Sequence, residues 1–338
     1  AIAQTKTLYI GSYTKGDSEG IYKVDFNTKT GAFSNKSLVA KIENSSFIAL
    51  SKNKKHLYAA AREKEHNVSA FKVKKDGSLD FLNKLTSNGR GPCHVTINKK
   101  GNRVVVSNYG GGTVAIYSTE KDGKLKETSQ VFNHNTKEQK SHVHSALFFK
   151  NDLFVADLGR NAIYNYHLDH TSTYKLKFNT LVKTTGNPGP RHFKLTKNGK
   201  YVYVINEYAG SITSIKKTKN GFTQIDYDTT LRKDFKGKNT CADIHISKDE
   251  RFIYGSNRGE NTIAVFKRST KDGTLEKIQS ISTHGNWPRN FTLDPTGRFL
   301  LVANQKSNTI SIFSIHKNTG KLTYLNSTAI ASPTCLIF

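Results

Sequence analysis

Two short apolar segments joined by a polar turn recur along this chain. The turn is rich in Lys, Asn and Gly, and the second segment is rich in β-branched and aromatic residues. Six copies begin at Phe47, His94, Ser145, His192, Asp243 and Asn290, about 47–51 residues apart. A period of this length built only from strand-like segments is typical of a β-propeller with one four-stranded blade per repeat.

The two ends of the chain supply the strands of one more blade. Residues 7–13 (TLYIGSY) match the second strand of the repeat, residues 20–26 (GIYKVDF) match the third, and residues 334–338 (TCLIF) match a first strand. We therefore expect Cys335–Phe338 to pair beside Thr7–Gly11, which would remove exposed sheet edges. The predicted fold class is all-β: a seven-bladed β-propeller with four antiparallel strands per blade and a ring closed by the terminal strands.

The remaining pattern agrees with one ring. Asp-Gly and Asn-Gly pairs between the third and fourth strands supply the positive φ angles that tight hairpins need. No segment has the spacing of a long amphipathic helix, and no linker divides the chain. We predict a single domain over residues 1–338, with residues 1–6 as a flexible N-terminal tail.

Composition changes this picture little. The chain has 52 Lys and Arg against 26 Asp and Glu, a formal net charge of +26. Most lysines fall in the hairpin turns, spread around the ring, so we interpret them as a solvated basic surface and expect no nucleic-acid partner. No apolar run approaches the roughly 18 residues of a membrane span, so no membrane partner is expected.

Cysteine usage and the first residues bear on redox state and location. Cys93, Cys241 and Cys335 lie in different repeats without CxxC spacing, and we interpret them as structural thiols. The chain opens with Ala-Ile-Ala-Gln, which could be the small-residue remnant of a cleaved secretory signal. This favours an extracytoplasmic location, with a cytoplasmic one as the alternative.

Repeat geometry indicates where chemistry should lie. The start of each first strand and the end of each second strand meet near the axis on one face, here called the mouth. Residues before the first strands are Ser46, Cys93, His144, Arg191, Ala242 and Arg289. Those after the second strands are Tyr13, Arg62, Tyr109, Leu158, Glu207, Arg258 and Gln305. The mouth therefore collects charged side chains that differ from blade to blade.

Some polar residues near the mouth have a simpler interpretation. The recurring residues Asn108, Asp157, Asn206, Asn257 and Asn304 are expected to close turns by hydrogen bonding. His94 and His192 open first strands and are either packed imidazoles or part of a site. Glu207 and Arg258 come from successive blades, so we expect them to face each other across the mouth.

Several motifs resemble successive blades of the seven-bladed lactonase family, which includes propeller-type 6-phosphogluconolactonases and carboxymuconate cycloisomerases. The likeness runs from Tyr9 to Phe338 and is weakest in the second blade, where the family's pattern gives Arg62 no role. The motifs are residues 91–117, HVHS with VADLG at 142–159, GPRH to VINE at 189–207, 243–259 with SNRG, and 288–313.

The resemblance implies particular site residues. The acid–base histidine of the family falls on His144, its substrate-binding arginine on Arg191, its glutamate on Glu207 and its second arginine on Arg258. All four occupy mouth positions that the repeat geometry had selected independently.

These residue types suit the opening of a sugar δ-lactone. Glu207 or His144 could activate water as the general base, and Arg258 could stabilise the oxyanion. Arg191 and Arg289 could bind a phosphate or carboxylate in a bidentate manner. We expect Tyr109, Gln305 and His192 to contact the substrate as well.

We predict a small, anionic sugar lactone as the partner and expect no metal and no other cofactor. A mouth rich in arginine and poor in carboxylates argues against the six-bladed calcium lactonases. Two alternatives stay open: a cycloisomerase acting on a carboxylated lactone with the same residues, and a non-catalytic binding propeller. An unphosphorylated lactone is the alternative substrate if the protein is extracytoplasmic.

Overall fold

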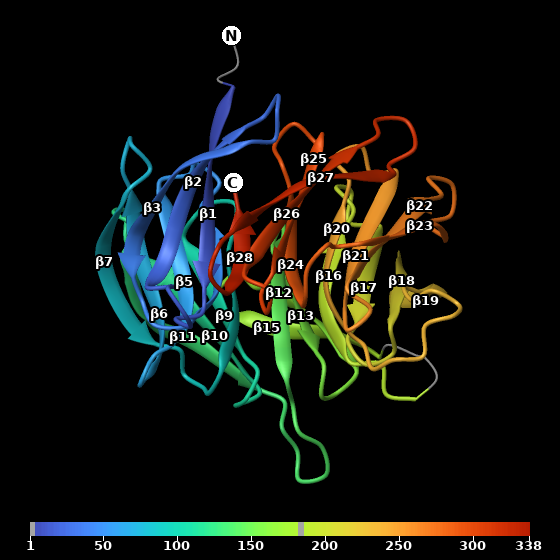
Figure 1. The fold of residues 1–338 in the computed structure, drawn as a ribbon. Coiled ribbons are helices and arrows are strands. Elements are labelled where there is room, and N and C mark those ends of the chain that lie inside the picture. Colours follow the sequence, from blue (N-terminus) through green and yellow to red (C-terminus); the bar gives the residue numbers. More distant parts are fainter. Residues whose placement is uncertain (1–3, 182–185) are drawn as a thin grey trace.

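The computed structural model describes residues 4–181 and 186–338, and within these ranges every regular element is a β-strand. The strands form seven antiparallel four-stranded sheets, the blades (Figure 1). Innermost strands contact each other in ring order, ending with β28 against β4. The predicted seven-bladed propeller is confirmed.

Each blade runs from the axis outward through four strands. The innermost strands are β4 (Ser45–Leu50), β8 (Pro92–Ile97), β12 (Val143–Phe149), β16 (Pro190–Leu195), β20 (Thr240–Ile246), β24 (Pro288–Leu293) and β28 (Pro333–Ile337). The second strands are β1 (Thr5–Ser12), β5 (His56–Arg62), β9 (Arg103–Asn108), β13 (Asp152–Asp157), β17 (Tyr201–Asn206), β21 (Phe252–Arg258) and β25 (Phe299–Asn304).

The outer half of each blade is more exposed than the inner half. The third strands are β2 (Gly20–Asn27), β6 (His66–Val73), β10 (Thr113–Thr119), β14 (Ala162–Leu168), β18 (Ser211–Thr218), β22 (Thr262–Arg268) and β26 (Thr309–Ile315). The outermost are β3 (Phe33–Lys41), β7 (Leu79–Thr86), β11 (Leu125–Asn133), β15 (Tyr174–Leu181), β19 (Gly221–Thr229), β23 (Leu275–Ser282) and β27 (Leu322–Ala329).

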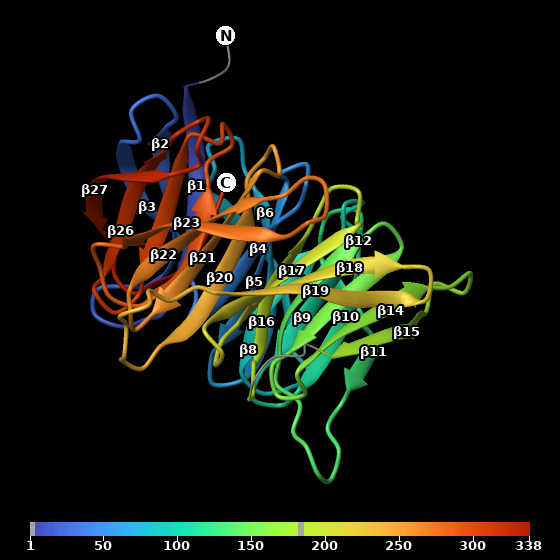
Figure 2. The same ribbon diagram turned by 90° about the vertical axis from the view of Figure 1, so that its right-hand side faces the viewer.

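The two ends of the chain share one blade, as predicted. Strand β28 pairs antiparallel with β1, with Ile10 opposite Leu336 and Gly11 opposite Cys335. The two strands lie side by side in Figure 1, and Figure 2 shows the C-terminus next to β1. The prediction of a flexible tail over residues 1–6 was wrong for Thr5 and Lys6. These residues begin β1 and pair with Asn27 and Phe26, because the edge of β2 extends far enough to bind them. Residues 1–3 lie outside the described residues.

Apolar side chains pack between neighbouring blades, and a tyrosine in the second strand fixes the spacing of several pairs. The Tyr58 hydroxyl donates to the carbonyl of Gly123 in the third-to-fourth-strand turn of the next blade, at 2.8 Å. Tyr9, Tyr203 and Tyr254 repeat this bond to Gly77, Gly273 and Gly320. Gly123 has φ of +93°, and a Cβ there would lie 2.2 Å from the His56 ring. Glycine in this turn thus serves both the hairpin and the contact between blades.

A β-bulge recurs in all seven innermost strands, two or three residues from the start. In β16, Pro190 pairs with Asn206 and His192 with Ile205, which leaves Arg191 as the extra residue. The extra residue is Ser46, Cys93, His144, Arg289 or Thr334 in five other strands, and β20 has its irregularity across Ala242 and Asp243. Because a bulge redirects a side chain out of the alternating pattern, it presents one residue per blade at the mouth.

The structure contains, within its described residues, no helix long and apolar enough to cross a membrane.

Candidate active site

The mouth is built from bulged first strands and the ends of second strands, as the repeat geometry predicts. Arg191 comes from the bulge of β16, Glu207 follows β17 of the same blade, and Arg258 ends β21 of the next blade. These three side chains form a continuous ionic cluster, here called the Glu207 cluster. It joins two blades that are adjacent in the ring.

Glu207 lies between the two guanidinium groups. Its Oε2 is 3.1 Å from Nε of Arg191, and its Oε1 is 3.2 Å from Nη2 of Arg258. The glutamate side chain is 14% exposed, whereas those of Arg191 and Arg258 are 2% and 6% exposed. The carboxylate is therefore the member of the Glu207 cluster with most access to a ligand in the mouth.

Backbone carbonyls hold both arginines in place. Nη1 of Arg191 donates to the carbonyl of Ala242 at 2.6 Å. Arg258 donates from Nε to Thr240 and from Nη2 to Cys241, both at 3.1 Å. Burial lowers the pKa of each arginine, and the adjacent Glu207 opposes that change. Fixed, paired cations of this kind are suited to electrostatic stabilisation of a developing oxyanion.

Aromatic side chains form the neighbouring part of the mouth. The Tyr109 ring stacks on His142 at 4.7 Å and meets His144 edge-on at 5.5 Å between centroids. His144 is 6% exposed and also contacts the ring of His192. Burial, together with the charge of Arg191, holds the pKa of His144 well below its usual value. Its imidazole is therefore neutral at neutral pH.

Tyr109 keeps its phenolic proton over the whole physiological range. Burial raises the pKa of its hydroxyl, and a hydrogen bond with Tyr208 and the charge of Glu207 raise it further. The hydroxyl can therefore donate a hydrogen bond beside the Glu207 carboxylate.

A second polar layer lies below the mouth in the central channel. His192 Nδ1 lies 2.8 Å from Oδ1 of Asp243, whose Oδ2 lies 3.0 Å from His245 Nε2 and accepts from Asn290. His192 is 6% exposed and its Nε2 lies 3.4 Å from Arg191 Nη1. His192, Asp243, His245 and Asn290 border a cavity of 220 Å³ in the channel. His192 therefore supports the Glu207 cluster from beneath.

Two further predicted residues, Arg289 and Gln305, lie next to the blade that the two ends of the chain share (β28, β1, β2 and β3), here called the terminal blade. The guanidinium carbon of Arg289 lies 5.2 Å from the centre of the Tyr13 ring. Gln305 is only partly buried, but its Oε1 is buried and has no hydrogen-bond partner among the described residues. Among the described residues, no hydrogen bond or ion pair joins either side chain to the Glu207 cluster.

Comparison with known proteins agrees with this architecture. Residues 7–338 match the sequence profile described as "Lactonase, 7-bladed beta-propeller". The chain belongs to the propeller lactonase family. Membership confirms the resemblance seen in the sequence and the expectation of a lactonase.

Individual relatives cover nearly the whole chain. A 6-phosphogluconolactonase of Bacillus subtilis is 34% identical over 98% of this chain and 97% of the relative. One of Formosa agariphila is 37% identical over 93% and 94% of the two chains. The solved structure of a periplasmic gluconolactonase from Pseudomonas aeruginosa superposes with a TM-score of 0.90, at 25% identity and 98% coverage of both chains.

Sequence reasoning missed two residues of this lactonase mouth. Trp287 precedes the β24 bulge, and the guanidinium carbon of Arg258 lies 5.0 Å from its ring centre. His142 stacks on Tyr109, and its Nδ1 is 2.8 Å from the Tyr109 carbonyl oxygen. Trp287 is the only tryptophan of the chain, which was a usable signal. The stacking of His142 depends on loop conformation and left no signal in the pattern.

The recurring asparagines lie beside the mouth but face the protein. Asn257 is fully buried and donates to the Thr230 carbonyl and the Thr262 hydroxyl. Asn108, Asn206 and Asn304 likewise bond to residues at the start of the third strand. These bonds close the turns between second and third strands, as their recurrence predicts.

The described residues contain no group of three or more His, Cys, Asp or Glu side chains placed to hold a metal ion. All three cysteines are free and buried. Burial raises the pKa of the Cys241 thiol to about 11, which leaves it protonated and unreactive.

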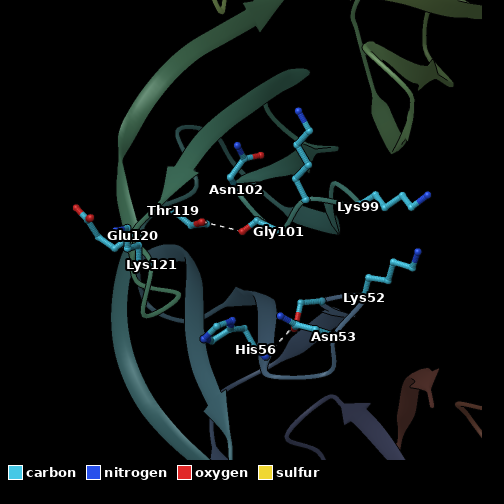
Figure 3. Close-up of a pocket in the computed structure, with 11 residues that line it drawn as sticks. Lys52, Asn53, His56, Lys99, Gly101, Asn102, Thr119, Glu120 and Lys121 are labelled. Atoms are coloured by element: carbon cyan, nitrogen blue, oxygen red, sulfur yellow. Dashed lines mark hydrogen bonds between the residues drawn. The ribbon is translucent and has the colours of Figure 1, made fainter.

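Several of the lysines that give the chain its positive charge line a cavity away from the mouth. A space of 530 Å³ lies among the turns after β4, β8 and β10, and Lys52, Lys99, Lys100 and Lys121 line it. In Figure 3 the side chains of Lys52 and Lys99 extend to one side and Lys121 lies on the other. These cations therefore do not converge on one point.

Proposed function

We propose that this protein hydrolyses an anionic sugar δ-lactone of the 6-phosphogluconolactone type. The observation that carries the proposal is the Glu207 cluster, a partly accessible carboxylate between two anchored guanidinium groups at the mouth of a lactonase-family propeller. The relatives named 6-phosphogluconolactonase support the substrate class.

In the proposed mechanism Glu207 removes a proton from water as the water oxygen attacks the lactone carbonyl carbon. The carbonyl oxygen becomes an oxyanion, and Arg258 stabilises it. Collapse of this intermediate breaks the bond to the ring oxygen, which receives the proton from Glu207 as it becomes a hydroxyl. The product is an open-chain aldonate, and one proton is released to solvent at neutral pH.

The charge and the burial of the remaining mouth residues indicate their roles. His144 is neutral and buried, so it orients the water or a hydroxyl group through one ring nitrogen rather than carrying charge. Tyr109 and Gln305 bind substrate hydroxyl groups. Arg191 is almost fully buried and positions Glu207, with little surface left for the substrate.

The test is lactone hydrolysis followed by proton release, with 6-phosphogluconolactone and gluconolactone measured side by side. We expect faster turnover of the phosphorylated lactone. Glu207→Gln and Arg258→Ala should each lower kcat by about 10²–10³-fold. Lys99→Ala, far from the mouth, is the matched control and should leave kcat unchanged.

Other outcomes would redirect the proposal. A preference for gluconolactone would keep the mechanism and replace the phosphorylated substrate, in line with the name of the Pseudomonas aeruginosa protein. Turnover equal to the spontaneous rate, unaltered in both variants, would reject hydrolysis. That result would instead favour a cycloisomerase or a non-catalytic binding protein.

A further inference from the structure

A second pair of arginines lies at the mouth beside the terminal blade. Tyr13 follows β1 of that blade, Arg62 ends β5 in the next blade, and Arg289 is the bulge residue of β24 in the preceding blade. The guanidinium carbons of Arg62 and Arg289 lie 5.9 and 5.2 Å from the centre of the same Tyr13 ring. In the seven-membered ring, this blade is opposite the one that carries Glu207.

Within the described part of the chain, neither guanidinium has an acidic partner. No carboxylate among residues 4–181 and 186–338 forms an ion pair with Arg62 or Arg289, and their side chains make no hydrogen bond there. Nε of Arg62 is buried and has no acceptor among the described residues. A buried donor without a partner is costly, and two like charges over one ring repel each other. Both costs would be relieved by an anion that accepts hydrogen bonds.

Both arginines hold mouth positions, Arg62 at the end of β5 and Arg289 at the bulge of β24. Burial raises the pKa of the Cys93 thiol, and the charges of Arg62, Arg191 and Arg289 oppose this rise. Cys93 is the bulge residue of β8, beside His144. The charges of Arg62 and Arg289 therefore reach the bulge of β8, where Cys93 lies beside His144.

We propose that Arg62 and Arg289 form an anion subsite that binds the phosphate of the substrate at the end remote from the lactone carbonyl. The identity of the ligand rests on the proposed function. With the carbonyl at Glu207 and Arg258, the sugar lies over His144 and Tyr109, and its far end meets Arg62. Among the described residues at the mouth positions defined above, four are arginines and one, Glu207, is a carboxylate, an excess of positive charge that suits a phosphate dianion.

Binding of the product separates this subsite from catalysis. Titration calorimetry at fixed ionic strength would measure the affinity of the full chain for 6-phosphogluconate, gluconate and inorganic phosphate. We expect Arg62→Ala and Arg289→Ala each to weaken 6-phosphogluconate binding about 10–100-fold and to leave gluconate binding unchanged. Arg62→Lys should recover part of the loss, because lysine keeps the charge without the planar fork.

Lys306→Ala is the matched control, since it removes a cation whose Nζ lies 3.4 Å from the centre of the Trp287 ring and not at Tyr13, and it should change affinity less than threefold. Unchanged 6-phosphogluconate binding in both arginine variants, with only a lower Tm, would reduce the pair to packing around Tyr13 and overturn the proposal. Inorganic phosphate binding as tightly as 6-phosphogluconate would overturn the assignment to substrate. Arginine-dependent binding without lactone turnover would support the subsite and reject the proposed reaction instead.

Discussion

The guanidinium carbon of Arg258 lies 5.0 Å from the centre of the Trp287 ring, so an aromatic face limits the movement of the arginine that pairs with Glu207. Trp287 has φ of +69° and also lies under Lys306, at 3.4 Å from Nζ. Cation–π contacts contribute about 0.5–2 kcal/mol. We expect Trp287→Leu to lower kcat for lactone hydrolysis about 3–30-fold, and Trp287→Phe to lower it less. An unchanged kcat in Trp287→Leu would show that the carbonyl bonds alone fix Arg258.

Arg191 should be needed for stability as well as for activity. Its replacement by Met would leave Glu207 with one cation and the Ala242 carbonyl without its donor. Removing one partner of a buried ion pair costs about 3–5 kcal/mol. Urea denaturation of Arg191→Met should show a loss of this size. Glu207→Gln/Arg191→Met should lose less than the sum of the two single variants, and additive losses would contradict the coupling of the two side chains.

Buried histidines should make the protein sensitive to acid. Burial lowers the pKa of His192 to about 3 and holds the pKa values of His94 and His144 well below 6.5. Because the unfolded chain then binds protons first, stability is present above about pH 6.5 and falls as the pH decreases. Because the pKa of His192 is about 3, this histidine alone should remove about 2 kcal/mol of unfolding free energy between pH 7 and pH 5, and His94 and His144 should act in the same direction.

Urea denaturation at the two pH values checks this slope. In His94→Gln the unfolding free energy should fall less between pH 7 and pH 5 than in the unchanged protein, because one buried histidine is missing. His170→Gln changes an exposed residue, so its unfolding free energy should fall as much as that of the unchanged protein. An undiminished fall of the unfolding free energy in His94→Gln would show that His94 does not contribute to the acid sensitivity.

Ring closure should depend on the side chains of β28. Leu336 is 4% exposed and packs in the apolar cluster that joins the terminal blade to β25 and β26. Leu336→Ala should lower the unfolding free energy by about 2–5 kcal/mol, since it leaves a cavity. Leu325→Ala, at a residue 41% exposed, should change it by less than about 0.5 kcal/mol. Equal losses in the two variants would contradict the closure.

The repeat explains why so much of the structure could be predicted. Each blade repeats the same alternation, so the strand order and the shared terminal blade followed from position alone, and so did the placement of Glu207 beside Arg258. The bulge at Arg191 could not be predicted, because a one-residue irregularity depends on backbone register and not on residue type. The unpaired state of Arg62 and the contact of Trp287 depend on side-chain directions across blades, which no single repeat contains.

The pairing of β28 with β1 has a consequence for synthesis of the chain on the ribosome. Strands β1, β2 and β3 emerge first, but the strand that covers the inner edge of β1 is translated about 320 residues later. Until then the nascent chain carries an incomplete sheet with free backbone donors and acceptors at that edge. We therefore expect chaperone dependence or aggregation during translation to centre on residues 5–12, and to end once residues 333–337 have left the exit tunnel.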